Sequence, residues 1–177
     1  MKMKGSKIGK HLALVLRHKP ESIGLKLDGY GWADVKKLVR KMGITEDVLI
    51  ETVRNDDKQR YSFSEDGTRV RANQGHSIDV DLELREVEPP PHLYHGTAAR
   101  FWESIRTGGL RPMSRKFVHI SGDTSTAVKV GRRHGKPMVL IVLAKEMHDD
   151  GHKFYLSENR VWLTEFVPPK YITRINL

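Results

Sequence analysis

The sequence predicts an α+β protein built from two lobes. Helical and strand-like patterns follow one another irregularly, and most of the expected strands are short. Near the middle of the chain three consecutive prolines, Pro89, Pro90 and Pro91, interrupt these patterns. Proline cannot donate a backbone hydrogen bond and favours an extended chain, so this run predicts a stiff linker. We therefore expect one lobe at residues 1–88 and a second at residues 89–177.

The composition is that of a globular protein with a polyanionic partner. The formal net charge is +9 and the pI is near 9.8, which favours nucleic acid, because binding releases the counterions condensed on its phosphates. The chain has no cysteine, which excludes disulfides and thiolate chemistry. We see no membrane-spanning apolar run and no cleavable leader. We expect a cytoplasmic protein without a membrane or an obligatory protein partner.

The first lobe is predicted to begin with three helices. Ser6, Asp34 and Thr45 each precede an amphipathic stretch and are of the type that caps a helix N-terminus. Gly43 is expected to end the second helix.

A hairpin is predicted to follow these helices. The stretch RYSFSEDGTRVRAN alternates around Asp66-Gly67, a strong signal for a two-residue turn, and this turn would set Tyr61 opposite Ala72 on an apolar face. Three helices and a hairpin together predict a winged-helix module. The other face of the hairpin, which is either solvated surface or a contact for anions, would carry Arg60, Arg69 and Arg71.

The second lobe is predicted to be a mixture of helices and short strands, and it holds most of the positive charge. Residues 89–177 contain 14 Lys and Arg against 7 Asp and Glu, whereas residues 1–88 contain 17 against 15. No GxGxxG or GxxxxGK[ST] motif indicates a doubly wound nucleotide-binding sheet. The expected elements, in order, are the strand LYHGT, the helix FWESIRTGGL, the strand FVHIS, the helix STAVKVGRRHG and the strands PMVLIVLA and SENRVWL.

Two clusters of cations stand where helices are expected to end. Arg132, Arg133 and His134 follow one apolar helix, and Arg17 and His18 follow another. Cations at a helix C-terminus interact favourably with the helix dipole, so capping is one explanation of both clusters. Binding of a phosphate is the other, because the guanidinium fork forms paired hydrogen bonds with phosphate oxygens.

Two histidines in expected strands form a second type of candidate. His95 and His119 are each followed within two residues by a hydroxyl, on Thr97 and Ser121. Such histidines are either buried hydrogen-bonding groups or parts of a binding site. The stretch HDDGH at residues 148–152 has side chains that can ligate metals, but no thiolate or HExxH supports it, and we expect no metal.

Taken together, these segments resemble the NAD-dependent RNA 2′-phosphotransferase family, whose members are related to the last step of fungal tRNA splicing. The resemblance covers nearly the whole chain and rests on LRHKPESIGLKLDGYGW, KQRYSFSEDGTRVRANQGHS, LYHGT, GLRPMSRKFVHIS, VGRRHGKPMVL and SENRVWL. It implies an N-terminal winged-helix lobe, a C-terminal ADP-ribosyltransferase-like lobe with short strands, and an active site in the cleft between them.

The resemblance also implies a metal-free reaction in which NAD is consumed. An internal RNA 2′-phosphate attacks NAD and expels nicotinamide, giving RNA that carries a 2′-phospho-ADP-ribose adduct. The adduct then resolves to 2′-OH RNA and ADP-ribose 1″,2″-cyclic phosphate. The expected partner is an RNA carrying a 2′-phosphate, with tRNA among the candidates.

The resemblance assigns roles to specific residues. Catalysis would fall to Arg17, His18, Arg60 and Arg133. The RNA phosphate would be lined by Arg71, Asn73, Gln74 and His76. NAD would lie against His95, Gly96, Thr97, His119, Ser121 and Val161, the last at the place where protein-modifying relatives carry glutamate. One departure is Arg160, which stands where the family pattern has glycine after asparagine.

Two other functions remain open from the sequence. The chain could ADP-ribosylate terminal phosphates of nucleic acids and stop after the first step. It could also be a winged-helix nucleic-acid binder whose second lobe is not catalytic. Release of nicotinamide distinguishes the binder from both enzymes, and retention of ADP-ribose on the product distinguishes the two enzymes from each other.

Overall fold

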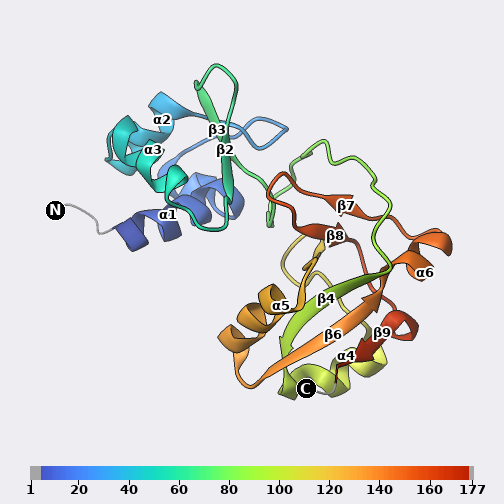
Figure 1. Ribbon diagram of the computed structural model, residues 1–177. Coiled ribbons are helices and arrows are strands. Elements are labelled where there is room, and N and C mark those ends of the chain that lie inside the picture. Colours follow the sequence, from blue (N-terminus) through green and yellow to red (C-terminus); the bar gives the residue numbers. More distant parts are fainter. Residues whose placement is uncertain (1–4, 176–177) are drawn as a thin grey trace. The chain divides into compact units, whose positions relative to one another are not determined.

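The computed structural model describes residues 5–175 and divides the chain into two compact units, Met1–Glu83 and Leu84–Leu177 (Figure 1). Each unit has its own hydrophobic core. Both combine helices with small antiparallel sheets, so the predicted α+β class is confirmed. Within the described residues, no helix is both long enough and apolar enough to cross a membrane.

The first unit packs three helices against a three-stranded antiparallel sheet. The helices are α1 (Gly5–Arg17), α2 (Val35–Met42) and α3 (Glu46–Arg54), with a 3-10 turn, η1 (Pro20–Ile23), after α1. The sheet has the order β1-β3-β2, formed by β1 (Ala33–Asp34), β3 (Arg69–Ala72) and β2 (Tyr61–Phe63). Apolar residues at helical spacing on α1 point into this core, which includes Leu12, Val15, Leu16, Leu38, Leu49 and Val70.

The helix ends follow the predicted capping residues in two of three cases. The side chains of Asp34 and Thr45 accept backbone N–H groups at 2.8 and 3.3 Å, and Gly43 ends α2 with a left-handed φ of 66°. The prediction for the first helix was wrong, because the chain is already helical at Gly5 and Ser6 therefore lies inside α1.

The hairpin has the predicted register but a different turn. Tyr61 lies opposite Ala72, as expected. However, the N–H of Gly67 donates to the carbonyl of Ser64 at 2.8 Å, so the turn starts one residue earlier than the sequence suggested. The Asp66 carboxylate accepts hydrogen bonds from the Ser64 hydroxyl and the following backbone, and these bonds lower the pKa of Asp66 to about 2.

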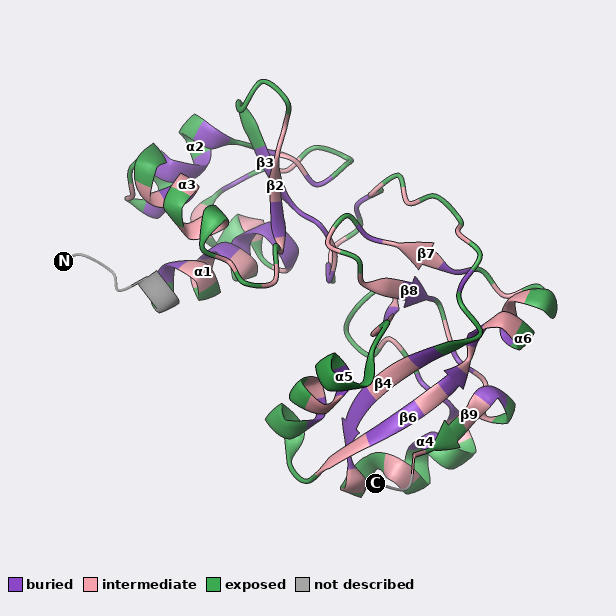
Figure 2. Cartoon of the chain, in the orientation of Figure 1, coloured by how far each residue is buried: buried purple, intermediate pink, exposed green. Residues whose placement is uncertain are grey.

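The second unit contains two three-stranded antiparallel sheets. One has the order β4-β6-β9, formed by β4 (His92–Ala98), β6 (Pro137–Leu143) and β9 (Ile172–Arg174). The other has the order β5-β8-β7, formed by β5 (Val118–Ile120), β8 (Trp162–Thr164) and β7 (Tyr155–Leu156). The helices are α4 (Trp102–Gly108), α5 (Thr124–Gly131) and α6 (Ala144–Asp149), and the 3-10 turns are η2 (Ala99–Phe101), η3 (Arg132–His134) and η4 (Pro169–Tyr171). Buried residues run along β4 and β6, whereas much of α5 is exposed (Figure 2).

Helix α5 lies directly on strand β4 because two glycines permit close approach of the backbones. A Cβ atom on Gly96 would overlap the carbonyl oxygen of Ala127 and would lie 2.9 Å from the backbone nitrogen of Gly131. A Cβ atom on Gly131 would in turn lie 2.7 Å from the carbonyl oxygen of Thr97. This close approach fixes the end of α5, and with it the following segment η3, beside β4.

The prolines belong to the second unit. Upstream of them, the N–H of Val87 donates to the carbonyl of Phe154 at 2.9 Å, and the carbonyl of Pro91 accepts from the N–H of Ala144 at 3.0 Å. These bonds attach the chain before the proline run to the residue that precedes β7, and they attach Pro91 itself to the start of α6. The division between the compact units therefore falls after Glu83, before the prolines.

Candidate functional site

Two of the predicted catalytic arginines lie close to one tyrosine of the first unit. Arg17, the last residue of α1, is only 8% exposed, and its guanidinium lies 5.7 Å from the centre of the Tyr61 ring. The Tyr61 hydroxyl donates to the carbonyl of Gly9 at 3.2 Å, which ties β2 to α1. Burial raises the pKa of Tyr61, and the positive charges of Arg17 and Arg60 partly oppose this rise.

His18 is fixed by the segment that follows the hairpin. Its Nδ1 lies 2.9 Å from the Ser77 hydroxyl, and the N–H of Ser77 donates to the carbonyl of Arg17 at 3.0 Å. A Cβ atom on Gly75 would lie 3.5 Å from the Arg17 guanidinium. Gly75 and Ser77 therefore lie against the end of α1, next to Arg17 and His18.

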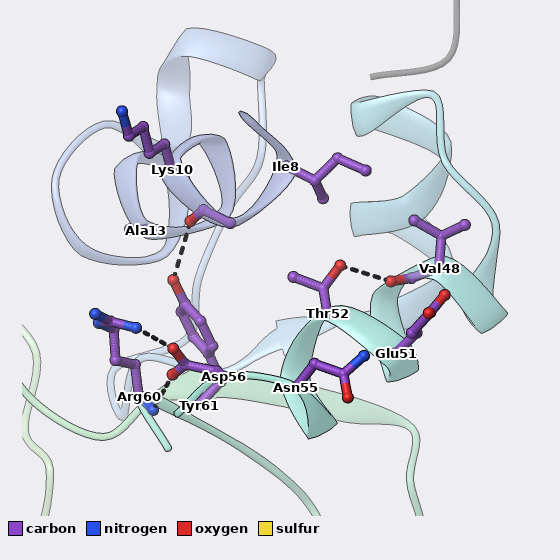
Figure 3. A pocket seen from close by; sticks show the side chains of 11 residues that line it. Ile8, Lys10, Ala13, Val48, Glu51, Thr52, Asn55, Asp56, Arg60 and Tyr61 are labelled. Carbon is purple, nitrogen blue, oxygen red and sulfur yellow. Dashed lines mark hydrogen bonds and ion pairs between the residues drawn. The ribbon is translucent and has the colours of Figure 1, made fainter. Parts of the chain in front are cut away.

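Arg60 is held by an acidic partner four residues upstream. Its Nη1 forms an ion pair with Oδ1 of Asp56, and its backbone N–H donates to Oδ2 of Asp56 at 2.6 Å (Figure 3). The Asp56 side chain is only 8% exposed, whereas Asp57, 3.8 Å from the same nitrogen, is 84% exposed. This pair borders a cavity of about 720 Å³ whose other walls come mainly from α1 and α3, with Tyr61 of β2 also lining it.

The four residues expected on the RNA side are mostly buried within the first unit. The guanidinium of Arg71 lies 4.5 Å from the centre of the Trp32 ring, and the Arg71 residue is 9% exposed. The amide of Asn73 donates to the carbonyl of Gln59 at 2.8 Å. His76 is 3% exposed, and Gln74 is half-buried. Arg71, Asn73 and His76 are thus largely shielded from solvent.

In the second unit, His95 has a defined tautomer and charge. Its Nδ1 lies 3.0 Å from the carbonyl oxygen of His119, and because a carbonyl can only accept, Nδ1 carries the proton. Burial lowers the pKa of His95. The hydrogen bond to the His119 carbonyl opposes part of this shift, and the electrostatic interaction with His134 adds to it. A neutral ring with a protonated Nδ1 leaves Nε2 as a hydrogen-bond acceptor.

Five of the six predicted NAD residues lie on β4 and β5 or directly after β5, near the point where these strands meet. Tyr94, next to His95, and Ser121 exchange backbone hydrogen bonds of 2.9 and 2.8 Å, which join the two sheets. Gly96 and the buried Thr97 continue β4 beneath α5. Strand β5 brings His119 to the same corner, since its carbonyl holds the ring of His95.

Val161 lies at the end of a tight turn just before β8. The N–H of Arg160 donates to the carbonyl of Ser157 at 2.8 Å, and the Ser157 N–H donates to the carbonyl of Val161 at 3.0 Å. Arg160 has a left-handed φ of 58°. This conformation explains why glycine would be expected there, since a left-handed non-glycine residue costs about 1–2 kcal/mol.

Arg133 lies on η3, directly after α5, and is exposed. The N–H of Ala99 donates to the carbonyl of Lys136 at 2.9 Å, which anchors this segment to the end of β4. Residues 124–145 contain no Asp or Glu, so the positive charge of η3 has no acidic neighbour along this stretch. The same segment influences the pKa of His95 through His134.

The two aspartates of HDDGH interact with neighbouring side chains. Asp150 accepts a hydrogen bond from the Tyr171 hydroxyl and pairs with Lys170 at 3.0 Å, and Asp149 pairs with Lys145 at 2.5 Å. Among residues 5–175, no group of three or more His, Asp or Glu side chains is arranged to hold a metal ion.

Sequence patterns missed several residues that hold these side chains. Asp56 and Arg60 stand four residues apart, the spacing at which opposite charges can meet in a helical turn, so a charge-pattern search could have found this pair. Ser77 is 59 residues from His18, and no local signal connects them. The missed residues are Trp32, Asp56, Tyr61 and Ser77.

Comparison with known proteins places the chain in one family. The model of the "RNA 2'-phosphotransferase, Tpt1 / KptA family" matches residues 3–166. A "Probable RNA 2'-phosphotransferase" of Flavobacterium johnsoniae is 55% identical over 170 residues, covering 93% of each chain. Proteins with the same name are 55% identical in Agrobacterium fabrum, covering 93% of this chain and 91% of that one, and 51% identical in Fusobacterium nucleatum, covering 94% and 96%. The chain therefore belongs to the RNA 2′-phosphotransferase family.

Proposed function

We propose that this chain removes an internal 2′-phosphate from RNA by transferring it to NAD. The observation that carries this proposal is the extent of the family match, which runs through residues 3–166 and so includes every candidate residue of both units. The arrangement of cations and hydrogen-bonding groups in each unit supports it further.

In the first step, an oxygen of the RNA 2′-phosphate attacks C1″ of the nicotinamide-bearing ribose. The bond between this carbon and the nicotinamide nitrogen breaks, and nicotinamide leaves as a neutral molecule. The phosphate is already an anion and needs no general base. Arg17 and Arg60, both close to Tyr61, serve to hold and orient it.

In the second step, the ribose 2″-hydroxyl attacks the same phosphorus, and the bond to the RNA 2′-oxygen breaks. The transition state gathers negative charge on the equatorial oxygens, and guanidinium donors strengthen their contacts as this charge grows. Arg133 and Arg60 fill this role. His18, held by Ser77, moves a proton from the attacking hydroxyl or to the departing RNA oxygen.

The residues at the junction of β4 and β5 fit an NAD molecule as the second substrate. The acceptor Nε2 of neutral His95 suits a ribose hydroxyl, and Ser121 offers a further hydroxyl at the same corner. The apolar Val161 leaves the ribose 2″-hydroxyl free for the second step, where a carboxylate would hold it.

The two units take the roles that the family pattern implies. The first unit, with three helices and a hairpin, serves as a winged-helix lobe that binds the RNA, including tRNA that carries a splice-site 2′-phosphate. The second unit, with its two small sheets, serves as an ADP-ribosyltransferase-like lobe that binds NAD. The net charge of +9 supports a polyanionic substrate.

Incubation with a short RNA that bears one internal 2′-phosphate tests the proposal. We expect loss of the phosphate only when NAD is present, with release of nicotinamide and ADP-ribose 1″,2″-cyclic phosphate. A chelator should not change the rate. Retention of the phosphate, or a strict requirement for a divalent ion, would contradict the proposal. RNA that keeps ADP-ribose as its final product would instead indicate ADP-ribosylation alone.

A further inference from the structure

Asp56 uses both of its carboxylate oxygens on a single residue, Arg60. Oδ2 accepts the backbone N–H of Arg60 at 2.6 Å, and Oδ1 accepts its Nη1 (Figure 3). The carbonyl of Asp56 also accepts the N–H of Gln59 at 2.8 Å, so the chain from Asp56 to Arg60 forms a closed turn. One acidic side chain therefore fixes both the backbone and the guanidinium of Arg60.

The contacts leave one side of the guanidinium available. Within residues 5–175, the intramolecular partners of the Arg60 guanidinium are Asp56 and the more distant Asp57, and both lie at Nη1. Nε and Nη2 form the other edge of the planar fork, which is the edge suited to two parallel bonds with a phosphate. The Arg60 side chain is 30% exposed, and neither Nε nor Nη2 is among the fully buried nitrogens that lack a hydrogen-bond partner within the described residues, so this edge is open to solvent.

Burial distinguishes the two acidic neighbours of Arg60. The Asp56 side chain is 8% exposed, and a buried carboxylate attracts a cation more strongly than a solvated one does. Asp57 is 84% exposed and 3.8 Å away, so solvent screens its attraction. The two aspartates thus form a natural pair for comparison, since they are adjacent and carry the same charge.

We propose that Asp56 is a positioning residue, which holds Arg60 by Nη1 so that its Nε and Nη2 edge faces the RNA 2′-phosphate. This proposal rests on the proposed function, because it concerns the same reaction. Asp56 touches no substrate and acts only through Arg60. A flexible arginine would bind phosphate in many orientations, whereas a fixed one is ready for the transition state of the second step.

The test compares Asp56→Asn with Asp57→Asn in the full chain. Asparagine keeps one acceptor oxygen but replaces the other with an NH₂ group, so it cannot bind both the backbone N–H and Nη1 of Arg60. In single-turnover reactions with NAD and 2′-phosphorylated RNA, Asp56→Asn should slow the second step roughly 10- to 100-fold and leave the first within a few-fold. RNA carrying the ADP-ribose adduct should build up, and Asp57→Asn should behave like the parent chain.

A double-variant comparison separates positioning from a purely structural role. If Asp56 acts through Arg60, the variant with both Asp56→Asn and Arg60→Ala should be no slower in the second step than Arg60→Ala alone. In a chain that carries Arg133→Ala, adding Asp56→Asn should instead slow the second step by a further factor. A lowered melting temperature with unchanged rates, or equal effects of Asp56→Asn in both backgrounds, would overturn the proposal.

A measurement without turnover keeps this inference distinct from the proposed function. Nitrogen-15 NMR should show separate, slowly exchanging Nη signals for Arg60 in the parent chain, and these should merge in Asp56→Asn but not in Asp57→Asn. If the parent chain consumes no NAD, the proposed function fails, and these spectra still show whether Asp56 fixes the guanidinium. Merged signals in the parent chain would refute the positioning role.

Discussion

At the scale of single residues, the guanidinium of a predicted catalytic arginine is expected to contribute differently to the two steps of the reaction. In the first step the phosphate is the nucleophile, so arginine contacts orient it but also withdraw electron density. In the second step the phosphate is the electrophile, and removal of one charge-assisted hydrogen bond costs about 3 to 4 kcal/mol, or about 10² to 10³ in rate. Alanine variants of Arg60, Arg133 and His18 should therefore accumulate the ADP-ribosylated RNA, which a denaturing gel resolves.

Arg106→Ala is a suitable control for these variants, because Arg106 pairs with Glu103 at 2.7 Å on the exposed side of α4. We expect it to leave both steps unchanged. If all three alanine variants lose both steps equally and no adduct is ever detected, these side chains serve substrate binding alone.

The buried ring of His95 predicts a specific pH dependence of stability. Its pKa is lowered in the folded chain, so the unfolded chain takes up this proton more readily. The stabilisation is present above the ordinary histidine pKa of about 6.5 and is lost as the pH falls through the lowered value. His95→Asn should therefore flatten the decline of the unfolding free energy between about pH 7 and pH 5. Denaturant titrations at several pH values measure this, and an unchanged slope would show that His95 is not the linked group.

At the scale of elements, the packing of α5 on β4 depends on the absence of a side chain at Gly96. The atom that an added methyl group would overlap is a backbone carbonyl oxygen, which cannot rotate away. We expect Gly96→Ala to destabilise the second unit by about 3 kcal/mol, at the upper end of overpacking effects. Gly108→Ala is the matched control, because a Cβ atom there meets nothing within 4 Å. Thermal denaturation distinguishes the two, and equal melting temperatures would contradict this account.

The sequence was a good guide where the determinants of an element are local. The caps Asp34 and Thr45 and the register of the hairpin follow from neighbouring residues, and the structure confirms them. Strands β7 and β9 are only two and three residues long and exist through pairing with distant partners, so no local pattern indicated them. The sequence also does not show to which unit the proline run belongs, because the hydrogen bonds that attach this segment to the second unit involve residues far along the chain.

The candidate site was predictable in composition but not in the neighbours of each side chain. The resemblance to the family identified the side chains of the candidate site. However, no sequence spacing and no residue propensity indicates that His18 contacts Ser77 or that the Arg71 guanidinium lies over the Trp32 ring. Both interactions join segments that are far apart in the chain. Only the fold brings such segments together, and for this reason the partners of the predicted residues had to come from the structure.

At the scale of the whole molecule, the proposed reaction uses side chains from both units. Arg17, His18 and Arg60 belong to the first unit, and His95 and Arg133 belong to the second. Because each unit has its own core, residues 1–83 and residues 84–177 should each fold when expressed separately, as circular dichroism would show. Neither should release nicotinamide from NAD in the presence of 2′-phosphorylated RNA. Turnover by the second unit alone would contradict the proposed division of roles.

The distribution of charge predicts how RNA binding responds to salt. Each phosphate of single-stranded RNA that a cation neutralises contributes a slope of about 0.7 in the fall of log K with log salt. Lys129 and Lys136 lie in residues 124–145, which contain no acidic residue, so their charges are not neutralised along this stretch. The double variant Lys129→Gln, Lys136→Gln should reduce the slope by about 0.7 for each phosphate that these lysines neutralise in the parent chain.

The matched control is the double variant Lys153→Gln, Lys170→Gln, which removes the same amount of charge. These two lysines already pair with carboxylates at 3.4 and 3.0 Å, so the control should leave the slope unchanged. Titrations of a fluorescent RNA between low and physiological salt measure both slopes. Equal slopes for the two variants would mean that net charge, and not this acid-free segment, governs binding.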